Sequence, residues 1–88
     1  MAAKTGNADA AKLLLNKGAD VNSKSDLGDT PLHEAIAWGH FKNVVKILID
    51  HGADINAMNK DGRTPLAIAK EKRYGDIIDL LREHGAAE

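Results

Sequence analysis

The stretch Gly28–Leu32, GDTPL, returns 34 positions later as Gly62–Leu66, GRTPL. A second stretch keeps the same spacing, because Gly18–Asn22 (GADVN) returns as Gly52–Asn56 (GADIN). A fixed period of roughly 20–50 residues is the signature of an architecture built from stacked repeats. Such stacks present an extended surface rather than a closed pocket, so the sequence directs the search for function toward a binding partner.

Composition narrows the possible functions. The 88 residues include no cysteine, which excludes disulfides, thiolate metal sites and cysteine nucleophiles. The net charge of −1 argues against nucleic acid or an anionic membrane as the main partner. No apolar stretch approaches the ~20 residues of a membrane span, and Met1–Gly6 lacks the apolar core of a secretion signal. We therefore expect an intracellular, cytoplasmic protein that contacts neither nucleic acid nor membrane.

The middle of the chain predicts two short helices. Thr30 and the proline after it are typical of a helix start, and we expect a first helix over residues 31–38 that is broken at Gly39. A second helix is expected over residues 43–50, ended by a left-handed Gly52. Residues 53–56 are expected to be extended and residues 59–62 to form a tight turn. A further helix is expected over residues 7–16.

Only three aromatic residues occur, so the core has to be aliphatic. Helices this short are stable only when one face is buried against a neighbouring repeat. We expect an inter-repeat core that includes Ile36, Leu48, Leu66, Ile68, Ile77, Ile78, Leu80 and Leu81.

Residues 30–35, TPLHEA, match every specified position of the signature T-P-L-H-x-A. Together with Gly39-His40 and the GADIN stretch, they show that the chain resembles the ankyrin-repeat family over essentially its whole length. The resemblance implies an all-α solenoid of stacked helix-turn-helix units joined by hairpin-like turns. Residues 1–88 would form one domain, with a partial row over about 1–25, a complete row over 26–59 and a C-terminal cap over 60–88.

The rows depart from the family pattern at informative places. The third row has Ala67 where the signature has histidine, and Arg82 stands where the earlier rows have Leu15 and Ile49. A charged residue there suits the end of a stack. The first row lacks the Thr-Pro-Leu-His opening, so we expect about two and a half repeats with a truncated N-terminal row.

Catalytic and metal chemistry find little support. His33 has no nucleophile–base set around it, and the resemblance implies that it supports the turn by hydrogen bonding near the threonine of the same motif. None of the four histidines has the i, i+4 spacing of a helical metal pair, although His51 and His84 occupy the same position in successive rows. Asp20 and Asp54 suit turn formation. We expect no catalytic residue, no metal site and no cofactor.

The resemblance places partner binding at the turn tips and at the exposed face of the first helix of each row. Carried over position by position, Lys4, Thr5 and Ala37 join that face, and the predicted partner-binding residues are Asp26, Leu27, Asp29, Trp38, Lys60, Asp61, Arg63, Glu71 and Lys72. Trp38 is the strongest candidate, because tryptophan leads the residue types found at interface hot spots. The alternative is that Trp38 folds over the adjacent row and seals the stack.

We therefore predict a non-enzymatic protein–protein interaction module. Two alternatives stay open: a designed or excised repeat fragment without an evolved ligand, and a regulatory segment of a larger enzyme or channel. The truncated first row would leave an apolar face uncovered, which predicts possible self-association into a homo-oligomer through that face.

Overall fold

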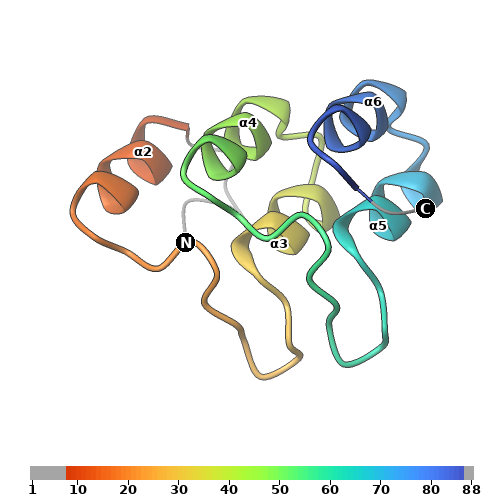
Figure 1. Ribbon diagram of the computed structural model, residues 1–88, viewed down its shortest axis with the longest axis horizontal. Coiled ribbons are helices and arrows are strands. Elements are labelled where there is room, and N and C mark those ends of the chain that lie inside the picture. Colours follow the sequence, from red (N-terminus) through yellow and green to blue (C-terminus); the bar gives the residue numbers. More distant parts are fainter. Residues whose placement is uncertain (1–7, 87–88) are drawn as a thin grey trace.

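The computed structural model describes residues 8–86 and consists of five helices in two layers. In chain order they are α2 (Ala8–Asn16), α3 (Pro31–Ala37), α4 (Lys42–Asp50), α5 (Pro65–Lys72) and α6 (Gly75–Glu83). Helices α2, α4 and α6 lie side by side in one layer, with α3 and α5 below them in the other (Figure 1). Within residues 8–86 there is no strand, which confirms the predicted all-α class.

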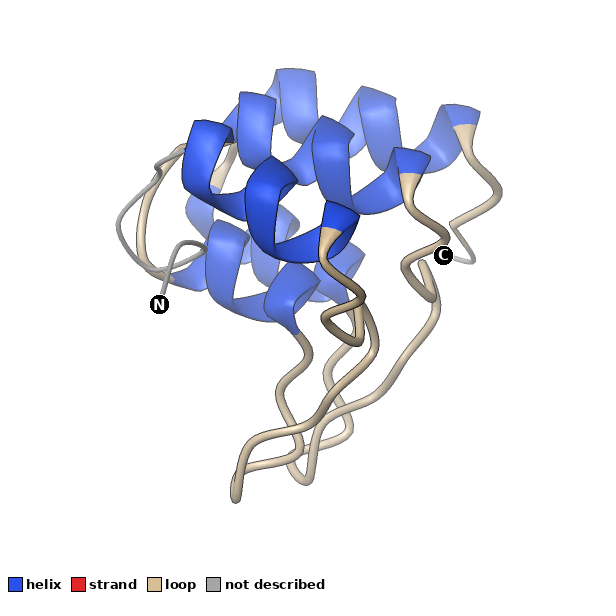
Figure 2. Ribbon diagram, turned by 90° about the vertical axis from the view of Figure 1, so that its left-hand side faces the viewer, coloured by secondary structure: helices blue, strands red, loops and turns tan. Residues whose placement is uncertain are grey.

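Two long loops project from the helical layers on the same side (Figure 2). Each tip contains a glycine with a left-handed backbone, Gly28 at φ +79° and Gly62 at φ +77°. The predicted turn over residues 59–62 is confirmed, because Gly62 N–H donates to Asn59 O at 3.0 Å. The neighbouring tips are also joined, since Lys60 N–H donates to Leu27 O at 3.0 Å. A Cβ on Gly28 would lie 2.9 Å from Lys60 N, so glycine permits this close approach.

Threonine begins both helices of the lower layer, which confirms the prediction for Thr30. Thr30 and Thr64 adopt extended backbone conformations, and their hydroxyl oxygens accept from the backbone N–H groups of His33 and Ala67. A proline follows each threonine at the first helical position, where its missing N–H costs no hydrogen bond. The recurring GxTPL stretch is therefore the structural start of each lower-layer helix.

Left-handed glycines end the upper-layer helices. Gly18, Gly52 and Gly85 have φ values of +93°, +88° and +94°. After α4, Ala53 N–H reaches back to Leu48 O at 3.0 Å, which satisfies a carbonyl that the helix leaves without a partner. The prediction for Gly52 is confirmed.

Three local predictions need correction. Helix α3 ends at Ala37, with Trp38 as its C-cap, and α4 begins one residue early at Lys42 with Phe41 as its N-cap. Residues 55–56 form a turn rather than an extended segment. The cause is the Asp54 side chain, which accepts from Asn56 N–H at 3.1 Å and bends the backbone around it. The predicted helix over 7–16 is seen from Ala8, and Asn7 lies outside the described residues.

The core is the aliphatic interface between the rows. Leu32, Ile36, Val44, Val45 and Ile77 are fully buried. Burying each such side chain contributes about 1.5–3 kcal/mol. Seven of the eight predicted core residues are buried, and Ile78 packs against the cluster while half-buried. Arg82 is exposed, whereas Leu15 and Ile49 at the equivalent positions are half-buried.

The connection between the two helices of a row has different residues in the second and third rows. A Cβ on Gly39 would lie 2.7 Å from the Phe41 ring, so a glycine is needed where phenylalanine fills the corner. In the third row the equivalent residues are Arg73 and Gly75, and a Cβ on Gly75 would meet nothing within 4 Å. The large and small residues have therefore exchanged places between the rows.

Candidate protein-binding surface

His33 is a structural bridge between two rows. Its side chain is fully buried, and its Nδ1 accepts from Thr30 N–H at 3.1 Å while lying 2.9 Å from Thr30 Oγ1. The Nε2–H donates to Arg63 O, thirty residues further along the chain, at 2.9 Å. Both ring nitrogens are thus engaged, Nδ1 within its own row and Nε2 with the next. This arrangement supports the structural role expected for His33.

The acidic turn residues of the GADVN and GADIN stretches also act on the backbone. Asp20 Oδ1 accepts from Asn22 N–H at 2.9 Å, and Asp54 makes the same contact with Asn56. Asn22 then joins its row to the next, because its Oδ1 accepts from Asp54 N–H at 2.7 Å and its amide donates to Gly52 O at 3.3 Å. Asn56 donates to Gly85 O in the same way. These residues are explained by turn formation and stacking.

His51 and His84 each bind their own helix. Their Nδ1 atoms lie 2.9 Å from Ile47 O and Leu80 O, one turn earlier, where they satisfy carbonyls at the helix ends. Among residues 8–86, no group of three or more histidine, aspartate or glutamate side chains could hold a metal ion.

Asp76 lies at the centre of a small charged cluster at the N-terminal ends of α4 and α6. His40 Nε2–H donates to Asp76 Oδ1 at 2.6 Å, and Lys42 Nζ lies 3.9 Å from its other oxygen. The His40 hydrogen bond is the main cause that holds the pKa of the Asp76 carboxyl below its ordinary value of 3.8. Burial opposes this pKa shift, while Ile77 N–H and the charges of His40 and Lys42 add to it. The His40 ring also lies 4.8 Å from the Tyr74 ring. The cluster links the second row to the third.

The turn tips present the exposed residues predicted for partner binding. Leu27 is 69 % exposed, and Asp26, Lys60 and Asp61 are exposed as well. Asp29 differs from them, because it is half-buried and its Oδ1 accepts from the Asn59 amide at 2.9 Å. Asp29 therefore holds the two tips together.

An ion pair joins the tip of the third row, which contains Gly62, to helix α5. Arg63 Nη1 lies 3.0 Å from Glu71 Oε1, and both side chains are about half exposed. Lys72, the last residue of α5, is also exposed. The pair shows that the tip and the C-terminal end of α5 belong to one surface.

Trp38 lies at the end of α3 and is 62 % exposed. This exposure contradicts the alternative in which its ring seals the stack. Trp38 and Lys72 occupy equivalent positions in adjacent rows, and α3 packs against α5. Trp38 thus stands at the end of the helix that packs against α5, one row before Lys72.

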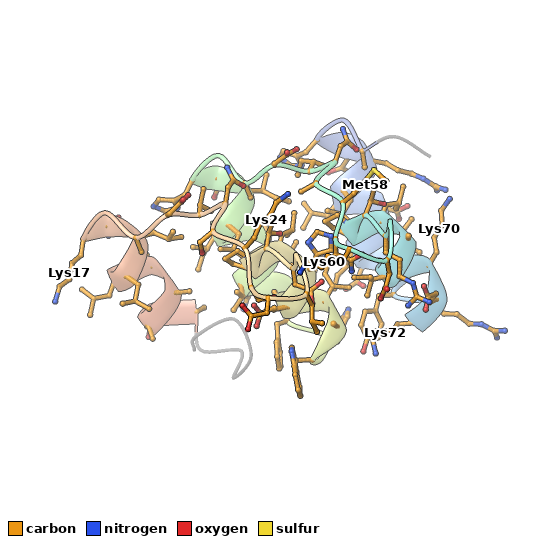
Figure 3. The ribbon with its side chains drawn as sticks, turned by 90° about the horizontal axis from the view of Figure 1, so that it is seen from below. Lys17, Lys24, Met58, Lys60, Lys70 and Lys72 are labelled. Atoms are coloured by element: carbon orange, nitrogen blue, oxygen red, sulfur yellow. The ribbon has the colours of Figure 1, made fainter. Side chains whose placement is uncertain are left out.

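Met58 is a further candidate that the sequence prediction missed. It is 57 % exposed and lies beside the tip of the third row, where a Cβ on Gly62 would be 3.8 Å from the Met58 methyl group. Figure 3, which looks at the molecule from the side of the tips, shows Met58, Lys24 and Lys60. Lys24 is the equivalent of Met58 in the preceding row, so the row alignment could have indicated its position. Lys4 and Thr5, which were predicted to extend the surface, lie outside the described residues.

Two hollows are lined neither by Trp38 nor by α5, although Ser25 of the tip that contains Gly28 lines the smaller one. One, of about 500 Å³, runs between α4 and α6 and is lined mainly by charged residues such as Lys46 and Asp79. Another, of about 210 Å³, lies between α2, α3 and α4 and is lined by Leu14, Leu15 and Leu48 among others. None of the helices within residues 8–86 has the length and apolar character that a membrane span requires.

Comparison with known proteins agrees with this architecture. A family model described as "Ankyrin repeats (3 copies)" matches residues 1–88. The chain is 54 % identical over 37 residues to the "Neurogenic locus Notch protein" of Drosophila melanogaster, and 51 % identical over 37 residues to the "Neurogenic locus notch homolog protein 2" of Homo sapiens. These matches cover 42 % of this chain but only 1–2 % of the length of the relatives. Ankyrin repeats are generally non-enzymatic modules that bind other proteins. The family model spans the whole chain and agrees with the stacked helix pairs, so this chain belongs to the ankyrin-repeat family.

Proposed function

We propose that this chain binds a partner protein through the surface formed by the turn tips, Trp38 and the C-terminal end of α5. The observation that carries the proposal is the exposure of two large apolar side chains, Leu27 at a tip and Trp38 at the end of α3, with a third, Met58, exposed beside Gly62. Rigid presentation of such side chains lowers the ordering cost of association. Exposed tryptophan beside charged residues is also typical of binding hot spots.

Other features of the molecule favour this surface over a pocket. His33, Asp20 and Asp54 are engaged with the backbone, as described above, and Asn22 and Asn56 bridge rows. The scaffold is thereby built from a different set of residues from those at the tips. Exposed positions can then vary without loss of the fold, in agreement with the separation of function from fold that is common in repeat proteins.

The proposal is tested with a partner selection that compares matched variants. A library of displayed proteins is selected against the native chain, and the selected binders are measured against Leu27→Ser/Trp38→Ser and against Lys46→Ser/Glu83→Ser. Lys46 and Glu83 are exposed on α4 and α6, so the control also introduces two serines, away from both proposed binding surfaces. We expect binding to fall by more than about tenfold for the double variant and to stay within about twofold for the control. Binders that tolerate the double variant would contradict the proposal.

Self-association through the α2 side is a second candidate. Leu13 and Leu14 are 54 % and 50 % exposed on α2, and Leu14 also lines the hollow of about 210 Å³. Two copies that face each other across this side would cover these leucines, since a two-fold contact brings the same patch together from both. Sedimentation over a range of concentrations tests this proposal. We expect a native dimer that Leu13→Ser/Leu14→Ser converts to a monomer, and a strict monomer at high concentration would contradict it.

A further inference from the structure

Opposite charges gather on the two sides of the third row. Residues 60–73, which form the tip and α5, carry more basic than acidic side chains: Lys60, Arg63, Lys70, Lys72 and Arg73 against Asp61 and Glu71. Helix α6, in the other layer, has the reverse balance: Asp76, Asp79 and Glu83 against Arg82. An anionic ligand is thus attracted to the α5 side and repelled from the α6 side.

The cations at the end of α5 are not neutralised by their neighbours. The ion pair between Arg63 and Glu71 uses the one acidic residue of α5. Within residues 8–86, neither Lys72 nor Arg73 forms an ion pair, and both are exposed. Two adjacent positive charges are therefore presented to solvent.

Arg73 ends α5 with a left-handed backbone, and Tyr74 N–H closes the helix by donating to Ala69 O at 3.1 Å. Arg73 has φ +60° and ψ +37°, and within the described range it is the only residue other than glycine with a positive φ. A side chain with a Cβ is disfavoured in this left-handed conformation, where glycine fits without penalty. The helix end accounts for this backbone, and the exposed arginine side chain adds a positive charge that a glycine at the same turn would lack.

Trp38 completes the surface next to these cations. It occupies the position of Lys72 in the preceding row, and the α3 and α5 helices pack against each other at the ~8–10 Å separation of neighbouring helices. The exposed Trp38 thus stands one row before Lys72, on the helix that packs against α5. We call Trp38, Lys72 and Arg73 the indole–basic patch.

We infer that the indole–basic patch binds an acidic segment of a partner polypeptide that also carries a large apolar side chain. This inference rests on the proposed function and specifies the chemistry of the partner. The apolar side chain packs on Trp38, while carboxylates of the segment pair with Lys72 and Arg73. The acidic α6 and the net charge of −1 favour a short polypeptide over nucleic acid, whose binding relies on an extended basic surface.

The test uses random 16-residue peptides displayed on phage and selected against the full chain. We expect the enriched peptides to be acidic, to contain an aromatic or large aliphatic residue, and to bind less tightly as salt is raised. Single-stranded oligodeoxynucleotide is expected not to displace them. Enrichment of neutral or basic peptides that still require Leu27 and Trp38 would overturn this inference and leave the proposed function standing. Failure to enrich any peptide would contradict both.

Variants of Arg73 separate a binding role from a structural role. Arg73→Gly removes the charge and the backbone strain, so it should raise the melting temperature and weaken the enriched peptides about two- to fivefold. Arg73→Lys keeps the charge and the strain, and should leave peptide affinity within about twofold. Lys72→Gln should weaken binding like Arg73→Gly, whereas Lys46→Gln on the α4 side should not. Unchanged affinity in both Arg73→Gly and Lys72→Gln would overturn the inference.

Discussion

Replacement of His33 by alanine tests the bridge between the second and third rows. The change removes a fully buried ring that contacts Thr30 through one nitrogen and the Arg63 carbonyl through the other. Both backbone groups lose a partner, and the ring leaves a void between the rows. We expect the variant to fold more weakly, with the loss concentrated between the second and third rows.

The magnitude follows from the two groups. Thr30 is only 1 % exposed, so its N–H is left buried without a partner at a cost of about 1–3 kcal/mol. The Arg63 carbonyl contact is only partly buried, so water replaces it and the lost bond costs about 1 kcal/mol. The sum is a loss of about 2–4 kcal/mol in the free energy of unfolding. In a domain of this size that corresponds to a fall of roughly 10–25 °C in melting temperature.

Urea unfolding followed by circular dichroism measures the effect, with His84→Ala as the matched control. The exposed His84 ring contacts a carbonyl of its own helix, so its loss should cost about 1 kcal/mol or less. Thr64→Ala provides a second control, because the third row has Ala67 in place of the bridging histidine and the loss is that of a cap alone, about 1 kcal/mol. If His33→Ala destabilised the protein no more than His84→Ala, the bridge would contribute nothing and the reasoning would be refuted.

Three further changes test other parts of the account. Gly39→Ala forces a Cβ against the Phe41 ring and should lower the free energy of unfolding by about 1–3 kcal/mol. Gly75→Ala meets open space and should be neutral or stabilising. Equal effects of the two changes in chemical unfolding would contradict the exchange of large and small residues. Asn56→Ala removes the solvent-exposed hydrogen bond to Gly85 O. The free energy of unfolding should fall by about 0.5–1.5 kcal/mol, and an unchanged urea midpoint would rule this out. Because the pKa of Asp76 is lowered in the folded protein, its contribution to stability is fully present above pH 3.8 and is lost as the pH falls through the folded pKa. The stability difference between native protein and Asp76→Asn should therefore be seen at neutral pH and disappear in acid. A difference that persisted at the lowest pH would contradict the His40 contact as its cause.

Residues with a strong local preference made most of the fold predictable from sequence. Thr30, with the proline after it, starts a helix by its own chemistry, and Gly52 ends one because it accepts a left-handed backbone. The exact ends were less predictable, because α4 begins after Phe41, which makes no side-chain capping hydrogen bond and so gives no local start signal. The turn at residues 55–56 was missed because the contact of the Asp54 side chain decides the backbone there.

The candidate surface was predictable in position but not in detail. Equivalent row positions indicated the tips and Trp38, yet the half-buried link between Asp29 and Asn59 depends on how two tips meet. The exposure of Met58 was also missed. Its row equivalent is Lys24, and a methionine on its own is as compatible with a core position as with an exposed one. The left-handed backbone of Arg73 has no signal in its residue type, since arginine rarely adopts it.

The central claim, that function lies on the exposed surface beside the scaffold rather than within it, is tested most directly by the fluorescence of Trp38. The chain has a single tryptophan, so its emission reports this one site. The account predicts that the unliganded protein emits near the maximum of a solvated indole and shifts to shorter wavelength when a selected peptide binds. Emission that is already blue-shifted in the unliganded protein, and unchanged by the peptide, would contradict it.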